Sequence, residues 1–228
     1  MIRFTDTNHW EGILDFQHIY DSGIRFNYMK ATEGVNFVDS QFHRSVFECV
    51  DKNIVWGGYH YFLGNVDPFG QAQHFYNVAK ETQLPPVVDV EEYNNLGIAK
   101  SLFTTRLKLM LDRVEYLFGR KPIIYTGHYM WPALTTSPGW AKEYKLYLGR
   151  YRLTVPTDFP SPWTSSDMIF WQFSDREPVG NYRLDCNYFF GTEKEFYALA
   201  NVEFKSLAER VSELETRVAN LESIVLGS

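Results

Sequence analysis

Carboxyl groups recur in this chain at the ends of short apolar, β-rich runs. Four of them are Asp6, Asp89, Glu91 and Asp185. Residues 85–91 read Pro-Pro-Val-Val-Asp-Val-Glu, and alternation along a strand puts Asp89 and Glu91 on one face, roughly 6.5 Å apart. Carboxyl groups packed in a partly dry pocket raise the proton affinity of at least one of them. The pattern therefore predicts a general acid beside acids that stay ionised, which is the division of labour that glycosidic cleavage requires.

Four further polar side chains end or follow other apolar runs, namely Glu33, Tyr61, Tyr125 and Gln172. In a β/α barrel, reactive groups come from the carboxyl ends of different strands, which all open at one face. If the runs are barrel strands, these side chains border the same opening as the acids. The sequence then predicts a ring of acids and polar aromatic residues around one mouth.

Each acid also has a purely structural explanation, which the sequence leaves open. Glu91 fits an exposed acid at a strand end, and Asp89 or Asp6 fits the cap of a following turn or helix. Asp185 fits a turn, and Glu33 fits a loop. Each signal is weak by itself, and the common position at strand ends is what favours a site.

The elements that must position these residues are strands separated by helical segments, a pattern typical of β/α units. Amphipathic segments at 37–53, 68–83 and 98–118 predict helices, the last ended by Gly119. The eight predicted strands are residues 2–4, 26–30, 55–62, 86–90, 122–125, 146–151, 168–173 and 183–185.

The connections at 127–144 and 152–167 are rich in Pro, Trp, Ser and Thr and have no convincing helical period. A complete barrel of eight β/α units takes about 250 residues. The sequence therefore predicts an α/β fold in which residues 1–192 form a shortened, irregular TIM-like (β/α) barrel that lacks some of its helices.

Residues 193–228 differ in character and are predicted to be a C-terminal coiled-coil helix. Thr192 and Glu195 form a capping box, from which one helix is expected to run on into the heptads. Apolar residues then alternate at spacings of three and four over about three heptads, as in an a/d stripe. They are Phe204, Leu207, Val211, Leu214, Val218, Leu221 and Val225.

Charged residues flank this stripe where parallel neighbours pair. Arg210 and Arg217 fall at g, and Glu215 and Glu222 fall at e, five residues further on. The pattern predicts a parallel homo-oligomer through residues 204–225, of two, three or four chains. The alternative is a single amphipathic helix folded back onto its own barrel.

The composition of the chain restricts the kinds of partner that it is expected to bind. The chain has 228 residues and a net charge of -6, with 22 Lys and Arg against 28 Asp and Glu, so no basic surplus favours nucleic acid. No apolar run is long enough to span a bilayer, and the amino terminus lacks the pattern of a secretory signal. We therefore expect no nucleic-acid or membrane partner, and synthesis in the cytoplasm without a signal peptide.

Cofactor and metal chemistry have no pattern in the sequence. Cys49 and Cys186 are far apart, without a C-x-x-C, and are expected to be free buried thiols. The six histidines show no metal-ligand spacing, and no phosphate-binding glycine loop or G-x-S-x-G occurs. No cofactor and no metal are expected.

Six motifs in order resemble glycoside hydrolase family 25, the muramidase-type lysozymes found in many bacteriophage endolysins. The resemblance covers about residues 1–192, and the ordered set is specific although each piece alone is not. The motifs are Asp6, Lys30-Ala31-Thr32-Glu33-Gly34, Gly58-Tyr59-His60-Tyr61-Phe62, Asp89-Val90-Glu91, Trp171-Gln172-Phe173 and Asp185-Cys186-Asn187-Tyr188-Phe189-Phe190-Gly191.

The resemblance implies hydrolysis of the β-1,4 bond between N-acetylmuramic acid and N-acetylglucosamine in peptidoglycan, in phage-mediated lysis, after release to the cell wall. It implies that Glu91 is the general acid and that Asp89 orients the substrate's acetamido group for attack with retained configuration. It also implies that Asp6 and Asp185 tune the site. Glu33, Tyr61, Tyr125 and Gln172 are similar to groove-lining positions that contact substrate.

The chain departs from the family pattern at two places. Many members read Asp-x-Ser near the start and Tyr-His-Phe at the third strand, where this chain has residues 6–8 as Asp-Thr-Asn and 60–62 as His-Tyr-Phe. Two other functions stay open: a non-catalytic wall-glycan-binding or virion structural module oligomerised by its tail, and an endo-acting glycosidase on chitin-like polymers.

Overall fold

Eight strands close into a barrel in the computed structural model, which describes residues 1–203, 208, 209, 211, 212, 214–216 and 218. The short strand β3 (Phe37–Val38) pairs only with β2, and pairing of β1 with β2 closes the ring. All eight predicted runs lie on the barrel strands. In order around the ring these are β1 (Ile2–Thr7), β2 (Phe26–Glu33), β4 (Val55–Tyr61), β5 (Val87–Val90), β6 (Ile123–Gly127), β7 (Leu146–Gly149), β8 (Met168–Val179) and β9 (Tyr182–Phe189).

The last barrel strand runs against the others, a departure from parallel β/α units that the prediction of a shortened, irregular barrel did not specify. β9 is antiparallel to both β8 and β1, whereas the other barrel pairs are parallel. Only Gly180 and Asn181 join β8 to β9, and two residues form a hairpin but cannot make the long crossover that parallel strands need. Gly180 has a φ of 57°, which this tight turn requires.

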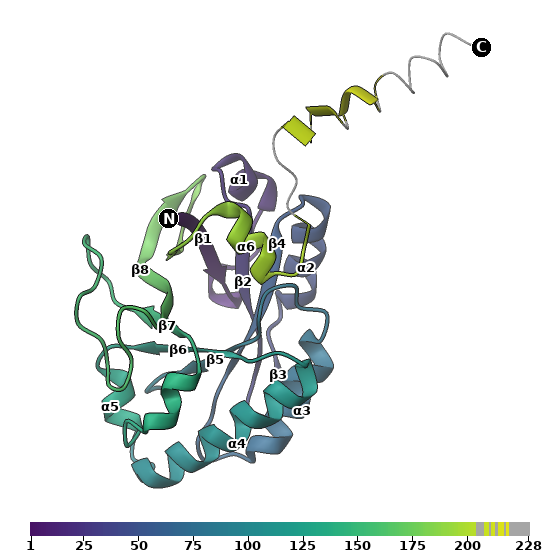
Figure 1. Ribbon diagram of the computed structural model, residues 1–228. Helices are drawn as coiled ribbons and strands as arrows, with labels where there is room; N and C mark the ends of the chain where they lie inside the picture. Colours follow the sequence, from purple (N-terminus) through teal and green to yellow (C-terminus); the bar gives the residue numbers. More distant parts are fainter. Residues whose placement is uncertain (204–207, 210, 213, 217, 219–228) are drawn as a thin grey trace.

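Helices cover one side of the barrel more fully than the other. In Figure 1, α3 (Pro68–Ala79) and α4 (Lys100–Phe118) lie side by side along the strands, whereas long irregular connections run beside β7. Asp67 caps α3 by accepting from the backbone N–H of Phe69 and Gly70. Gly119 ends α4 in the left-handed conformation, as predicted.

Two connections differ from the predictions. Residues 37–53 are not one helix, because β3 precedes α2 (Phe42–Asp51). Residues 127–144, predicted without helix, hold α5 (Met130–Leu134) and a 3-10 helix at Gly139–Glu143. These helices are too short for a helical period to be visible in the sequence. Within residues 1–203, the remaining helices are α1 (Phe16–Asp21), a 3-10 helix at His9–Glu11 and α6 (Glu193–Leu199).

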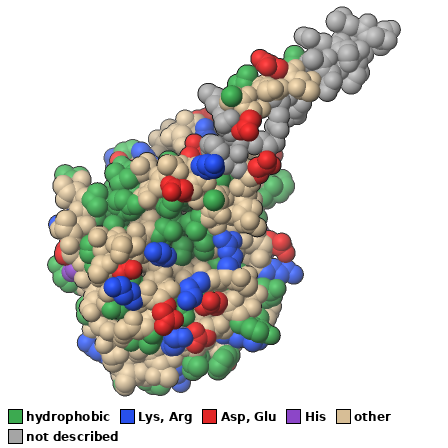
Figure 2. All heavy atoms as spheres, in the orientation of Figure 1, with side chains coloured by type: hydrophobic (Ala, Val, Ile, Leu, Met, Phe, Trp, Pro, Cys, Tyr) green, Lys and Arg blue, Asp and Glu red, His purple; other side chains and the backbone are tan. Residues whose placement is uncertain are grey.

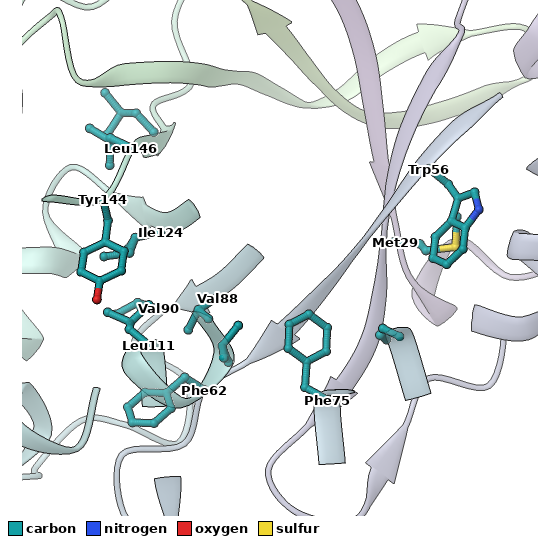
Figure 3. Packing of buried hydrophobic residues seen from close by; sticks show 14 of the residues in the cluster. Met29, Trp56, Phe62, Phe75, Val88, Val90, Leu111, Ile124, Tyr144 and Leu146 are labelled. Carbon is teal, nitrogen blue, oxygen red and sulfur yellow. The ribbon is translucent and has the colours of Figure 1, made fainter. Parts of the chain in front are cut away.

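Alternation along each strand divides the apolar side chains into two layers. Val88, Val90, Ile124 and Leu146 point outward and meet helix residues such as Leu111, as Figure 3 shows. The opposite faces of the same strands point into the barrel. The register of every strand is thereby fixed, because a slip by one residue would exchange the two faces.

The floor of the barrel is an aromatic plug. Phe170 is fully buried, with ring centroids 5.0 Å from Phe4, 5.8 Å from Phe189 and 5.7 Å from Phe196 of α6. Phe196 reaches the plug because α6 crosses that end of the barrel (Figure 1). This end is therefore sealed, and the interior opens only toward the carboxyl ends of the parallel strands.

The start of the tail differs from the prediction of one continuous helix. The capping box at Thr192 and Glu195 is present, but α6 ends at Leu199 and Asn201 has a φ of 53°. The coiled coil at residues 204–225 falls largely on positions outside the described residues and stays a prediction. Among the described positions, Val211, Leu214 and Val218 are each exposed, between 44% and 57%.

Charged side chains of both signs lie on the surface of the molecule (Figure 2), and both cysteines are buried. Figure 2 shows Lys and Arg intermixed with Asp and Glu on the face seen in Figure 1, beside an area of apolar side chains. Within the described residues, no helix combines the length and the apolar character that crossing a membrane requires. Cys49 and Cys186 are free and buried, as predicted.

We predict that Phe170→Ala lowers the free energy of unfolding by about 3–5 kcal/mol, because it leaves a cavity at the centre of the aromatic plug. Urea denaturation followed by tryptophan fluorescence measures the change. The matched control is Phe47→Ala on α2, where the side chain is 72% exposed and a change of less than about 0.5 kcal/mol is expected. Equal losses in the two variants would contradict the central place of the plug.

Candidate active site

The predicted catalytic acids meet in one cavity at the open end of the barrel. The cavity has a volume of about 270 Å³, and Asp6, Asp89, Glu91 and Asp185 all line it. They come from β1, from the end of β5 and from β9. Asp185 lies near the start of its strand, and it reaches the open end because β9 runs antiparallel.

Asp6 lies at the centre of a hydrogen-bond network. Its Oδ2 accepts from Gln172 Nε2 at 3.0 Å and from Asn187 Nδ2 at 2.8 Å. The Tyr147 hydroxyl lies 3.0 Å from the same oxygen and 2.6 Å from Asn187 Oδ1. Tyr125 donates to Gln172 Oε1 at 2.6 Å and so orients the amide. These donors stabilise a negative charge on Asp6 although its side chain is buried.

Asp6 and Asp185 are direct partners across β1 and β9, and two charges placed so close repel each other. Burial, followed by the charge of Asp6, raises the pKa of Asp185 to about 9. Burial also raises the pKa of Asp6, against the effect of its hydrogen bonds to Asn187 and Gln172. Since the donors surround Asp6, the pair holds its charge there and its proton on Asp185 at neutral pH.

Asp89 and Glu91 share the inward face of β5 and its continuation. Burial raises the pKa of Glu91 to about 7, and the charge of Asp6 contributes in the same direction. Burial raises the pKa of Asp89 well above its usual range, and the charge of Glu91 adds to this. Asp89 Oδ1 is buried and has no hydrogen-bond partner among the described residues. Both groups therefore bind a proton more tightly than an exposed carboxyl group does.

Lys30 is the one cation among the described residues that line the cavity. Its Nζ lies 2.6 Å from Glu33 Oε2 and 4.9 Å from the centre of the Tyr61 ring. The charge of Lys30 lowers the pKa of both Asp89 and Glu91. It therefore limits how far burial can neutralise the acid pair.

The residues predicted to contact substrate fall in two places. Tyr61, Tyr125 and Gln172 line the acid cavity itself. Glu33 lines an adjoining groove of about 460 Å³, which Trp10 and Glu91 also border. Glu33 is thus one step removed from the acids, held there by its ion pair with Lys30.

The structural alternatives for Asp6, Asp89 and Asp185 do not apply. Asn8, not Asp6, caps the first helical turn at His9–Glu11, and Asp89 is 7% exposed within β5. The turn between β8 and β9 is made by residues 180 and 181, not by Asp185.

Sequence reasoning missed three members of the site: Lys30, Tyr147 and Asn187. Alternation was the available signal for Asn187, which lies two residues after Asp185 and so shares its face. The same rule places Tyr147 on the inward face of its strand. Lys30 was included only as part of a motif, because a lysine on an apolar strand does not reveal which acids it faces.

The aromatic side chains divide between the core and the groove. Trp171 is 2% exposed and belongs to the outer core, whereas Trp10 is 83% exposed at the edge of the cavity. The Trp10 ring packs 4.6 Å from His9, whose Nδ1 lies 2.6 Å from the buried Asp39 carboxylate. Asp39 thus anchors the wall that carries Trp10. Within the described residues, no group of three or more His, Cys, Asp or Glu could hold a metal ion.

Comparison with known proteins independently supports the interpretation of this cavity as an active site. Residues 5–182 match the family model described as Glycosyl hydrolases family 25. The chain is 35% identical over 209 residues to the uncharacterized protein YegX of Escherichia coli (strain K12), covering 88% of this chain and 74% of that one. It is 30% identical over 217 residues to Lysozyme M1 of Streptomyces globisporus, covering 88% and 71% of the two chains.

Solved structures agree with the sequence matches. The bacterial lysozyme from Streptomyces coelicolor superimposes with a TM-score of 0.80 at 27% identity, covering 88% of this chain and 97% of that one. Muramidase from Acremonium alcalophilum superimposes with a TM-score of 0.79 at 29% identity, covering 88% and 99%. The family match spans most of the barrel strands that carry the acids, and the chain therefore belongs to glycosyl hydrolases family 25 and is a glycoside hydrolase.

Proposed function

We propose that this protein is an N-acetylmuramidase that cleaves the β-1,4 bond between N-acetylmuramic acid and N-acetylglucosamine in peptidoglycan. The observation that carries the proposal is the meeting of Asp6, Asp89, Glu91 and Asp185 in one cavity at the open end of the barrel. Relatives named Lysozyme M1 and N,O-diacetylmuramidase, the second 28% identical over 187 residues, support the choice of substrate. Action in phage-mediated lysis, after release to the cell wall, is part of the same proposal.

Glu91 is the general acid of this mechanism. A pKa of about 7 leaves a large share of Glu91 protonated near neutral pH, where an ordinary glutamate is ionised. Its position after β5 is less enclosed than that of Asp89, so a sugar chain can reach it. Glu91 donates its proton to the glycosidic oxygen as the bond breaks.

Asp89 is the partner that positions the acetamido group. Asp89 is more deeply buried than Glu91, and burial raises the pKa of Asp89 well above its usual range. An acetamido N–H that donates to the unpartnered Oδ1 stabilises the ionised form of Asp89. Substrate binding then favours charge on Asp89 and a proton on Glu91. The acetamido oxygen, oriented in this way, attacks the anomeric carbon, and water completes hydrolysis with retained configuration.

Asp6 and Asp185 tune the pair from the opposite wall. The charge held on Asp6 raises the pKa of Glu91, so it helps to keep the acid protonated. Asp6 also lines the cavity that would hold the sugar ring, where its negative charge would stabilise the positive charge that develops as the bond breaks. Gln172 and Tyr125 hold Asp6 in place from β8 and β6.

The tail is proposed to form a parallel coiled coil that joins two or more chains. Support comes from the heptad spacing in the sequence and from the exposure of Val211, Leu214 and Val218 in the described part of a single chain. Several linked catalytic domains bind a polymeric wall more tightly than one, without any new contact.

We predict that Glu91→Gln abolishes clearing of purified peptidoglycan and lowers kcat by about 10²–10⁴-fold, because glutamine cannot donate a proton. Wild-type digests should gain reducing ends without new free amines. Glu143→Gln is the matched control, since Glu143 is 59% exposed and does not line the cavity, and it should retain full activity. Unchanged clearing by the Glu91 variant would favour a non-catalytic wall-binding module, and amine release would indicate an amidase or peptidase.

The pH profile tests the electrostatics of the pair. We predict that kcat/KM falls above pH about 7, because the acid must be protonated and loses its proton as pH rises through its pKa. Lys30→Met should move this alkaline limb to higher pH, since the charge of Lys30 lowers the pKa of Glu91. The exposed Lys142→Met is the control and should leave the limb in place. If the alkaline limb moved to lower pH in the Lys30 variant, the assignment of that limb to Glu91 would be refuted.

Removal of residues 204–228 should leave a monomer, because the predicted heptads are lost. Static light scattering compares the mass of the full chain with that of the shortened one. Activity on soluble fragments is expected to persist, while activity on whole walls falls as avidity is lost. A full-length chain that is already monomeric would contradict the coiled coil.

A further inference from the structure

Two openings lead out of the acid cavity, and they differ in charge. The first is the groove that contains Glu33 and Glu91, with Lys30 as its partner cation. The second is a pocket of about 550 Å³ at the carboxyl ends of β6 and β7, which we call the arginine pocket. It adjoins the acid cavity, because Tyr125 and Tyr151 line both. Its charged lining residues are Arg150, Arg152 and Glu92, and the imidazole of His128 lines it as well.

The two guanidinium groups of the arginine pocket are held in place by one carboxylate. Arg150 donates to Asp158 Oδ2 at 2.8 Å, and Arg152 donates to Asp158 Oδ1 at 2.7 Å. Arg150 also lies 4.8 Å from the centre of the Tyr129 ring. Asp158 does not line the pocket, so it fixes the arginines from behind. Such fixed side chains lose little conformational freedom when they bind a ligand.

The arginines retain capacity for an anion. Each guanidinium has five N–H donors, and one bond to Asp158 leaves donors over on both Arg150 and Arg152. The Arg152 side chain is 36% exposed and accessible from solvent. His128 lies with its Nε2 3.6 Å from Asp158 Oδ2, on the same cluster. Two guanidinium groups side by side fit a carboxylate, which they bind through paired hydrogen bonds.

The proposed substrate supplies such a carboxylate. A muramoyl residue carries a peptide on its lactyl group, and the peptide contains free carboxylates. The lactyl group branches from the same ring whose glycosidic bond is cleaved, so the peptide leaves the cavity close to Glu91. In the groove, the charge of Lys30 is already paired with Glu33, and no other Lys or Arg lines it among the described residues, whereas the arginine pocket offers two guanidinium groups to the carboxylate.

We propose that the arginine pocket binds a carboxylate of the peptide stem, so that the enzyme prefers glycan that carries peptides to glycan that has lost them. The proposal rests on the muramidase function above and names a second recognition site for it. Glu92, which also lines the pocket, restricts the anion to the arginine side. The specificity of the enzyme then depends on Arg150 and Arg152 as well as on the acid cavity.

The test compares two soluble peptidoglycan fragments of equal glycan length, one with its peptide stems and one with the stems removed. Arg152→Met in the full chain should raise KM for the stem-bearing fragment about tenfold, without changing kcat or the KM for the stem-free fragment. For wild type, KM for the stem-bearing fragment should rise with salt, and this rise should be smaller in the variant. Arg176→Met, at a side chain 78% exposed on β8, is the matched control and should change neither KM.

Other outcomes overturn the proposal. An unchanged KM for the stem-bearing fragment would show that the pocket does not bind the peptide. An equal rise for the stem-free fragment, whose lactyl group ends in its own carboxylate, would assign the pocket to the glycan instead. Arg150→Met should repeat the result of Arg152→Met, and circular dichroism checks that both variants fold.

Binding to an inactive enzyme separates this proposal from the muramidase function. If wild type released no reducing ends from either fragment, the proposed function would fail. Calorimetric titration of the Glu91→Gln protein with the stem-bearing fragment still tests the pocket. Adding Arg152→Met should weaken that binding about tenfold and leave binding of the stem-free fragment unchanged, and equal Kd values for the stem-bearing fragment would overturn the inference.

Discussion

The burial of several carboxyl groups in one cavity is the constraint on which the rest of this structure depends. Placing like charges together away from water is costly, and the molecule offsets the cost in three ways. Asp185 takes up a proton, Asp6 receives hydrogen bonds from neighbouring strands, and Lys30 provides a single positive charge. Asp89 and Glu91 stay buried near other acids, and their pKa values are therefore raised. A raised pKa is what a catalytic acid needs near neutral pH.

The barrel makes this arrangement possible because its interior is layered. Phenylalanines seal the floor, tyrosines such as Tyr147 and Tyr125 lie above them, and the acids lie at the open end. The sealed floor keeps water from reaching the acids from below, while the tyrosines supply hydroxyl groups to polar neighbours. Each strand thus contributes apolar packing at one end and chemistry at the other.

The β6–β8 side of the barrel is only partly covered by helices, and its irregular connections carry charged residues that lie near the site. The irregular connections there place Arg150, Arg152 and Asp158 beside the acid cavity, where a regular β/α unit would have a helix farther from the mouth. The two sides of the opening therefore differ in charge. A substrate with a neutral glycan and an anionic branch can use both, which links the departure from a regular barrel to the choice of substrate.

The sequence by itself determined the eight strands, the inward alternation of Asp89 and Glu91, and the family resemblance, because these depend on local periodicity and ordered motifs. It did not determine the direction of β9, the break after α6 or the partners of Lys30 and Asn187. Those depend on contacts between residues far apart in the chain. Asp6 and Asn187, for example, are 181 positions apart, yet Asn187 Nδ2 lies 2.8 Å from Asp6 Oδ2. A pattern along the chain reports which face a residue occupies, but only closure of the barrel decides which faces meet.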